Sequence, residues 1–477
     1  MNLKKKVING LVWSFTSQIV KVGGQFIITI TLMRLLSPSD FGFLGMAMAF
    51  TGFAAVFSDM GIGSALIQKQ DTDENHLSSA FWLNIVVGIS LTFIMITVSP
   101  LIARFYNTPQ LEPIIMVMSL NFFLASFSVV QRALLTKEMD FKRLIARDII
   151  AVIAGGSVGI ALAYYGFGIW SLVYQILAYT IINNIILWNI SPWKPKMLFS
   201  RRAINDIFTY SANLTGFNII NYLARNVDYL LIGKFLGAEA LGFYALAYKL
   251  MMVPLQNISA VISKVTFPAY SRIQNDIKKL SEVYLKTVKA VSLITFPMMF
   301  GLFVVAPEFV IVIFGPKWEP SILIVRIFCI CGALQSIGAL SGSIYQSLNE
   351  TRTQFRLELA GTLIVTIAIV IGLKFGTQGV AFFYTLQYLI WFNINLYFVL
   401  KLLNLKLGAF YPKLKATFII NIIMVMILFL IKPLLIFPQF WILNLLIVIG
   451  AMVYFFLLMI TKEIVFDNNR IVFNFLR

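Results

Sequence analysis

The stretch LLSPSDFGFLGMA, residues 35–47, returns two hundred positions later as FLGAEALGFYALA, residues 235–247. Both copies place a Gly-Phe pair at the same point, with Gly42 in the first and Gly242 in the second. A phrase of this length that recurs in an apolar chain indicates an internal duplication. The duplication decides the fold, and the fold narrows the function.

The composition indicates that the duplicated segments lie in a membrane. Of the 477 residues, 59% are hydrophobic and 12% are charged, and the mean hydropathy is +0.86. A soluble domain carries about 25% charged residues, and long apolar stretches recur along this whole chain, so we predict membrane-spanning helices. A transmembrane β-barrel would instead show segments of about ten residues with alternating character.

The apolar stretches predict about fourteen spans. The candidate spans are residues 8–36, 40–68, 78–105, 112–136, 145–165, 168–191, 205–236, 240–268, 285–314, 320–346, 357–375, 378–401, 416–432 and 440–461. When the spans are numbered in this order, the repeated phrase of residues 35–47 follows the first span, and its copy at residues 235–247 follows the seventh.

Three further pairs of stretches repeat in the same order. They are residues 99–113 with 306–320, Gln131 and Phe141 with Gln346 and Phe355, and residues 165–170 with 375–380. Each match falls six spans after its partner. Because an even shift preserves orientation, we expect parallel repeats related by an axis along the membrane normal.

The net charge of +18 is unevenly distributed among the connections between spans. By our assignment, about 28 of the 38 Lys and Arg residues lie in one set of longer connections, and about 6 lie in the other, shorter set. Positive-inside bias then places both termini in the cytoplasm. Anionic lipids or a phosphate-bearing substrate are a second interpretation of this charge, and nucleic acid is not expected.

We therefore predict an all-α polytopic membrane protein with two parallel six-helix lobes and two additional C-terminal helices. The lobes are residues 1–200 and 201–410, and residues 411–477 carry the additional helices and a cytoplasmic tail. Two such lobes around a central cleft are typical of alternating-access transporters. The connections are too short for a catalytic domain, which argues against an enzyme such as a sugar polymerase or ligase.

Several long phrases resemble one family. They include FSDMGIGSALIQKQ (residues 57–70), QRALLTKEMDFKRLIARD (residues 131–148) and NVDYLLIGKFLGAEALGFYALAYKL (residues 226–250). In these phrases the chain is similar to the Wzx-type polysaccharide flippases of the multidrug/oligosaccharidyl-lipid/polysaccharide (MOP) exporter superfamily. The resemblance extends over about residues 5–460. It implies a MATE-like core of twelve helices in two lobes, plus two extra helices.

The resemblance also implies a function. Wzx-type proteins move undecaprenyl-pyrophosphate-linked oligosaccharide repeat units from the cytoplasmic to the outer leaflet of the bacterial inner membrane, for O-antigen, capsule, exopolysaccharide or teichuronic acid synthesis. The implied partners are this lipid-linked substrate, membrane lipids and a polymerase or glycosyltransferase complex. The alternatives are a cation-coupled drug antiporter of the same superfamily, which predicts an acidic or apolar cavity, and a peptidoglycan-precursor flippase.

Cationic side chains inside the predicted spans are the candidate substrate site, because a charge at membrane depth is costly and commonly marks a transport pathway. These residues are Lys21, Arg225, Lys249 and Arg326. A pyrophosphate carries about two negative charges and requires Arg or Lys in order to leave water. The structural alternatives are an Arg225–Asp228 pair and snorkelling of Lys249 or Arg326 to the interface.

Two carboxylates inside the spans, Asp59 and Asp228, are candidates for coupling to H⁺ or Na⁺. The alternative is that they form structural ion pairs, with Asp59 reaching Lys21 across helices.

The remaining motifs favour no cofactor or metal. The DTD of residues 71–73 lies in a short loop beside the single histidine, His76, and is best explained as a solvated loop. Cys329 and Cys331 lie two apart within an apolar stretch, which favours buried packing over a metal site or disulfide.

Overall fold

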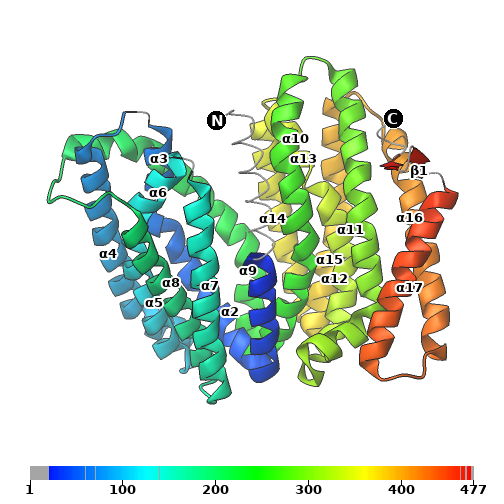
Figure 1. The fold of residues 1–477 in the computed structure, drawn as a ribbon, viewed down its shortest axis with the longest axis horizontal. Coiled ribbons are helices and arrows are strands. Elements are labelled where there is room, and N and C mark those ends of the chain that lie inside the picture. The colour runs from blue at the N-terminus through cyan, green and yellow to red at the C-terminus, as the bar shows by residue number, and fades with distance from the viewer. Residues whose placement is uncertain are drawn as a thin grey trace. The chain divides into compact units, whose positions relative to one another are not determined.

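The computed structural model describes residues 21–59, 61–69, 71–138, 140–461, 463–467 and 470–473. Almost all of this part of the chain is helical (Figure 1). The exception is an antiparallel hairpin near the C-terminus, in which β1 (Ile464–Asp467) pairs with β2 (Arg470–Phe473). The predicted all-α membrane fold is therefore confirmed.

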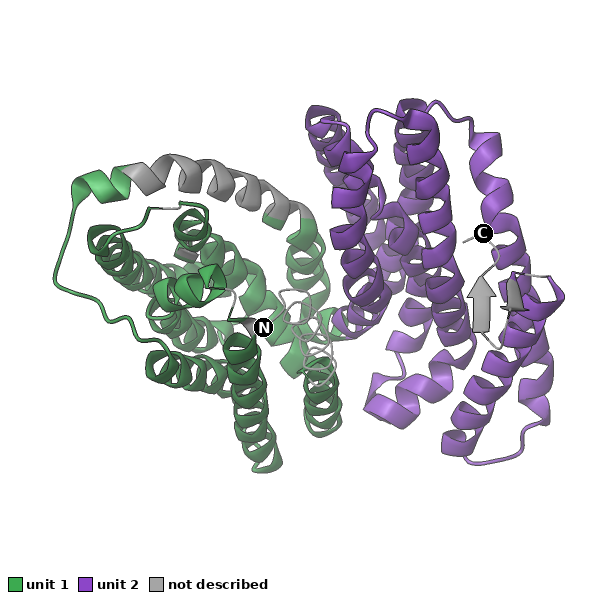
Figure 2. Ribbon diagram, turned by 45° about the horizontal axis from the view of Figure 1, so that its top comes forward, with its two compact units in different colours: residues 1–242 green, residues 243–477 purple. Residues whose placement is uncertain are grey.

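The described chain divides into two compact units, residues 1–242 and 243–477 (Figure 2). In the first unit a helix covers residues 21–35, followed by α2 (Pro38–Asp59), α3 (Ile62–Gln68), α4 (Glu74–Tyr106), α5 (Leu111–Ser126), α6 (Val129–Lys137), α7 (Phe141–Tyr164) and α8 (Ile169–Ile190). Helix α9 (Arg201–Pro254) belongs to both units.

The second unit continues from the end of α9. Its further elements are the π-helical turn η1 (Leu255–Ser259), α10 (Ala260–Arg272), α11 (Ile277–Phe314), η2 (Pro316–Trp318), α12 (Ser321–Gly338), α13 (Ser341–Ser347), α14 (Thr351–Leu373), α15 (Gly376–Leu402), α16 (Leu407–Ile431), η3 (Lys432–Leu434) and α17 (Gln439–Ile460). The unit boundary lies within α9, so the lobe boundaries at 200 and 410 stay predictions.

Ten helices among the described residues are long and apolar enough to cross a membrane. An eleventh is added if α5 and α6, which meet at a bend of 45°, form one span. Two expected spans, residues 205–236 and 240–268, run together through α9, whose backbone leaves helical geometry at Gly237. The count of about fourteen therefore stays a prediction.

Aspartate caps set the start of three long helices. The caps are Asp73 before α4, Asp140 before α7 and Asp276 before α11. Each carboxylate accepts a hydrogen bond from the backbone N–H three residues further on, over 2.9–3.2 Å. An Asp at this position satisfies an N–H group that has no partner inside the helix.

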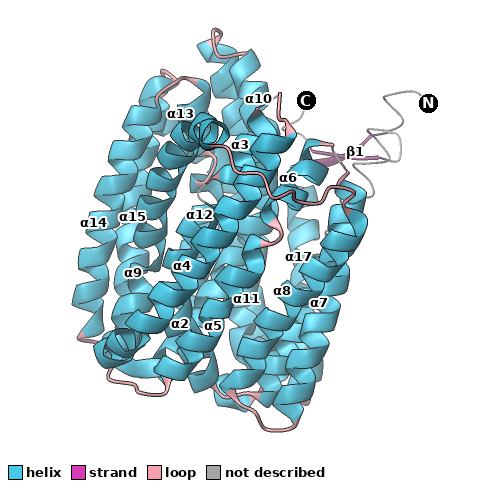
Figure 3. Ribbon diagram, turned by 90° about the vertical axis from the view of Figure 1, so that its left-hand side faces the viewer, coloured by secondary structure: helices cyan, strands magenta, loops and turns pink. Residues whose placement is uncertain are grey.

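Apolar contacts join the first helix to α7 and α8 in the first unit. Ile28 and Leu32 of the first helix form a buried cluster with Val152 of α7 and Leu172 of α8. The two partner helices lie side by side (Figure 3). This packing brings polar residues of the first helix close to α7.

In the second unit, α16 and α17 pack against α11. Leu293 of α11 clusters with residues of both helices, and the Tyr454 hydroxyl of α17 donates to its carbonyl oxygen over 2.7 Å. The additional C-terminal helices are thus attached through one helix of this unit.

The repeated opening phrases contact each other within the first unit. A Cβ atom at Gly42 would lie 1.7 Å from the carbonyl oxygen of Ala238, and one at Gly242 would lie 2.0 Å from that of Pro38. Pro38 and Ala238 are themselves equivalent positions of the repeat, so the contact is reciprocal. Only glycine permits this approach of the two backbones.

A second repeat match has a glycine with positive φ at the same position in both copies. Gly166, which lies before α8, and Gly376, the first residue of α15, have φ angles of 81° and 70°. These turns correspond in the sequence, so the duplication extends to local structure as well as to helix order.

Candidate functional site

Lys21 of the first helix forms an ion pair with α7. Its Nζ lies 2.6 Å from Oδ2 of Asp148, and the lysine side chain remains 33% exposed. Asp148 is seven residues from the start of α7, or about 10 Å along the helix at 1.5 Å per residue. The candidate cation Lys21 therefore has a carboxylate partner that the sequence analysis did not include.

Arg147 binds the other oxygen of the same carboxylate. Its Nη2 and Nε lie 2.6 Å and 3.2 Å from Oδ1 of Asp148. The arginine side chain is only 7% exposed. Its Nη1 has no hydrogen-bond partner among the described residues, although it is buried. Tyr179 of α8 lies close enough to interact electrostatically with all three charged groups.

We name Lys21, Arg147 and Asp148 the α7 charge cluster. Two cations share one carboxylate, so the cluster carries a net charge of +1. The buried Nη1 atom of Arg147, which carries two N–H groups, is without a partner among the described residues, and an unsatisfied buried donor costs free energy. The cluster therefore has spare capacity for an anionic acceptor.

The sequence contains a signal for this cluster that our interpretation missed. Arg147 and Asp148 end the phrase FKRLIARD and lie inside the predicted span 145–165, but we did not include them among the candidate site residues. The structure begins α7 at Phe141, so both residues lie on the helix, two turns in. Adjacent opposite charges inside a helix that continues into an apolar span are the feature to look for.

The predicted site residues on α9 differ in burial and in the unit to which they belong. The Asp228 side chain is 4% exposed, and its Oδ1 accepts a hydrogen bond from the backbone N–H of Tyr229 over 2.9 Å. The Arg225 side chain is exposed. Lys249 belongs to the second unit. The structure therefore tests no joint site made of Lys21, Arg225 and Lys249.

The last two predicted residues are Asp59 and Arg326. Asp59 ends α2, and its side chain lies outside what the structure describes. Arg326 of α12 donates from Nε to the carbonyl oxygen of Phe303 over 3.2 Å, and its guanidinium lies 5.8 Å from the centre of the Phe303 ring. These contacts give Arg326 a packing role between α11 and α12.

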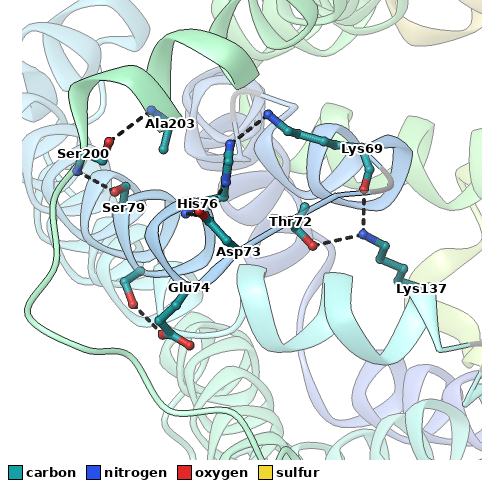
Figure 4. A network of polar contacts seen from close by, with 10 residues as sticks. Lys69, Thr72, Asp73, Glu74, His76, Ser79, Lys137, Ser200 and Ala203 are labelled. Carbon is teal, nitrogen blue, oxygen red and sulfur yellow. Dashed lines mark hydrogen bonds and ion pairs between the residues drawn. The ribbon is translucent and has the colours of Figure 1, made fainter.

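The loop that contains the DTD motif is a structural network (Figure 4). The Nζ atom of Lys69 lies 2.8 Å from Nε2 of His76, and Nδ1 of His76 lies 2.5 Å from Oδ1 of Asp73. Lys137 of α6 donates to the carbonyl oxygen of Lys69 and to Thr72 Oγ1 over 2.6 Å and 3.0 Å. Every polar group of this loop named here serves to hold it against α4 and α6.

The hydrogen bond from the backbone N–H of His76 lowers the pKa of the Asp73 carboxyl, and the His76 side chain lowers it further. The same end of α4 anchors the connection between α8 and α9, because Ser79 Oγ accepts from the backbone N–H of Ser200 over 2.8 Å. Among the described residues no group of three or more His, Cys, Asp or Glu side chains is arranged to hold a metal ion.

The family model for polysaccharide biosynthesis proteins matches residues 31–323, which is more than half of the 477 residues. The chain belongs to the polysaccharide biosynthesis protein family.

Two curated relatives of this family member cover most of its length. It is 30% identical over 378 residues to the lipopolysaccharide biosynthesis protein WzxC of Escherichia coli (strain K12), covering 78% of this chain and 76% of the relative. It is 27% identical over 432 residues to the teichuronic acid biosynthesis protein TuaB of Bacillus subtilis (strain 168), covering 90% of this chain and 89% of the relative.

Solved structures of a flippase and of a transporter share the fold of this family member. The lipid II flippase MurJ, in an inward closed conformation, matches with a TM-score of 0.76 and 16% identity over 96% of this chain and 99% of that chain. An inward-facing multidrug resistance MATE family transporter of the MOP superfamily matches with a TM-score of 0.66 and 16% identity, over 81% and 98%. At this identity the likeness shows the fold alone.

The family match also locates the charged residues. In this polysaccharide biosynthesis protein, Arg147, Asp148, Arg225, Asp228 and Lys249 fall within the matched residues 31–323. Lys21 and Arg326 fall outside them.

Proposed function

We propose that this protein is a flippase that moves oligosaccharide repeat units linked to undecaprenyl pyrophosphate from the cytoplasmic to the outer leaflet of the bacterial inner membrane. It is not an enzyme in this proposal, and it works by alternating access. The observation that carries the proposal is family membership combined with cations inside membrane-spanning helices. Lys21 and Arg147 supply two positive charges for a diphosphate that carries about two negative ones.

The proposed orientation places both termini in the cytoplasm. Asp148 then lies about 10 Å inside the cytoplasmic end of α7, at the depth where a headgroup in the inner leaflet enters. Arg225 and Lys249 are further proposed ligands along the path, and Asp59 and Asp228 are proposed to couple transport to H⁺ or Na⁺. Arg326 has the weakest claim, since its contacts with Phe303 account for its charge.

A deletion strain tests the function directly. Cells that lack the gene but keep the upstream glycosyltransferases are expected to accumulate lipid-linked repeat units on the cytoplasmic leaflet, where they are labelled in inside-out vesicles but not in intact cells. Restoring the gene is expected to return them to the outer leaflet. Failure to accumulate the lipid-linked units would contradict the proposal. Accumulation of the peptidoglycan precursor instead would identify that lipid as the substrate.

A further inference from the structure

The α7 charge cluster resembles a binding site that is already occupied by an anion of the protein itself. The two oxygens of Asp148 are divided between two cations, Lys21 on Oδ2 and Arg147 on Oδ1. A phosphoryl group offers the same arrangement, with separate oxygens for an ammonium and for a planar guanidinium. The carboxylate thus occupies the place that an incoming phosphoryl group would take.

The donors of the cluster exceed the capacity of this carboxylate. Nη1 of Arg147 is buried without a partner among the described residues. The Lys21 side chain is 33% exposed and carries three N–H donors, of which Asp148 takes one in the structure. A diphosphate has more acceptor oxygens and more charge than one carboxylate, and it would satisfy donors that Asp148 leaves unused.

An ion pair in the second unit gives the opposite pattern. Lys432 lies 2.8 Å from Glu308, and its Nζ also donates to the carbonyl oxygen of Val304 over 3.3 Å. One cation meets one carboxylate there, with no net charge. That pair is electrostatically complete, whereas the α7 charge cluster has a net charge of +1.

We propose that Asp148 is an internal substitute for the substrate's diphosphate: it holds Lys21 and Arg147 in the empty protein, and an isoprenoid diphosphate displaces it from both cations. This inference rests on the proposed function. Because the carboxylate must be outcompeted, ligands with less charge, such as an isoprenoid monophosphate, bind poorly. Asp148 is therefore a specificity-determining residue, and the cations are never left unpaired at membrane depth.

Binding to the full-length protein in lipid nanodiscs tests this exchange, with undecaprenyl diphosphate and undecaprenyl phosphate as probes. The wild type is expected to prefer the diphosphate. Asp148→Asn removes the competing charge but keeps the side-chain shape, so it is expected to bind both probes about tenfold more tightly, or more, and to discriminate less between them. Lys21→Gln and Arg147→Gln are expected to weaken diphosphate binding by a similar factor.

The matched control is Glu308→Gln, which removes the carboxylate of the complete pair in the other unit and is expected to leave both affinities unchanged. If Asp148 were only a structural clamp, Asp148→Asn would lose thermal stability without binding either probe more tightly. That result in folded protein would overturn the inference.

The charge-neutral double variant Lys21→Gln/Asp148→Asn covers the case in which the single variants fail to fold. It lacks the competing carboxylate but keeps Arg147, so it is expected to discriminate less between diphosphate and monophosphate than the wild type does, and unchanged discrimination would overturn the inference. These outcomes are distinct from failure of the proposed function, which would appear as a wild type that binds no undecaprenyl lipid and a deletion strain with no accumulation.

Discussion

Each compact unit holds a lysine–carboxylate pair within its apolar helices, and the two pairs are balanced differently. Glu308 and Lys432 neutralise each other 2.8 Å apart. Asp148 is shared between Lys21 and the 7%-exposed Arg147, which leaves a positive charge and an unused N–H group. A complete pair attaches one helix to another, whereas an incomplete cluster can also accept a ligand. Whether the charges of a buried group balance therefore distinguishes a structural role from a binding role better than the mere presence of charged residues does.

The largest expected effect comes from Arg147→Ala. This change removes two hydrogen bonds to the Asp148 carboxylate and leaves a cavity where the 7%-exposed Arg147 side chain packs, at a cost of about 3 kcal/mol of unfolding free energy. We expect loss of export together with a lower midpoint in denaturant unfolding of the purified protein. The control is Arg143→Ala on the same helix, because Arg143 is 57% exposed and its pair with Asp140 is worth about 0–1 kcal/mol. If Arg147→Ala and Arg143→Ala lost export and stability equally, the α7 charge cluster would contribute no more than an exposed ion pair does.

The next effect is steric and lies in the same unit. Gly42→Ala would place a Cβ 1.7 Å from a backbone oxygen, so the two copies of the repeated phrase must separate, at a cost of about 2 kcal/mol. We expect less folded protein, while each folded molecule binds undecaprenyl diphosphate as the wild type does. Gly301→Ala is the control, because no atom beyond its chain neighbours and the backbone of its own helix lies within 4 Å of a Cβ at that position. If folded Gly42→Ala protein bound undecaprenyl diphosphate more weakly than the wild type, weaker binding would reflect any disturbance of the first unit and would not be specific to the α7 charge cluster.

Breaking the complete pair is expected to have a smaller effect on stability and almost none on function. Glu308→Gln keeps a neutral acceptor beside Lys432, and we expect a loss of about 1 kcal/mol. Thermal unfolding measures the loss, and complementation of a deletion strain measures export, which should stay near wild type. Abolished export in folded protein would mean that the second unit's pair is functional as well.

The smallest effect concerns acid pH at the exposed cap of α4. The backbone N–H and side chain of His76 lower the pKa of Asp73 in the folded protein. This contribution is therefore fully present above the unfolded pKa and is lost as pH falls through the folded pKa. Asp73→Asn keeps a capping oxygen but no titrating charge, so its stability is expected to fall less steeply in acid than that of the wild type. If the stability of the wild type and of Asp73→Asn fell equally between pH 6 and about pH 3, the lowered pKa of Asp73 would make no contribution to stability.

The fold was accessible from sequence because its signals are local. Apolar stretches predict where helices lie, and helices cover most of the expected ranges, although the expected spans 205–236 and 240–268 run together through α9. Aspartates before α4, α7 and α11 mark where those helices begin. The four repeat matches predict the duplication, and Gly166 and Gly376 share its turn geometry. Periodicity, capping and turn chemistry act over a few residues, so one chain displays them directly.

The candidate site was only partly accessible. Lys21 could be selected because a charge inside an apolar stretch is conspicuous in a sequence. Its partner Asp148 could not, because it lies 127 residues further along the chain. Arg147 and Asp148 stand at the start of the predicted span 145–165, directly after a basic stretch, and only the structure shows that they meet Lys21.

The sequence by itself determined a duplicated, helical membrane protein with cations at membrane depth, because composition and repetition are properties of the chain alone. The tertiary structure decided which charges meet. Packing of the first helix against α7 and α8 brings Lys21 to Asp148, and the approach of Gly42 to Ala238 joins the two copies of the opening phrase. Pairing between distant residues depends on helix contacts in three dimensions, and no local pattern encodes it.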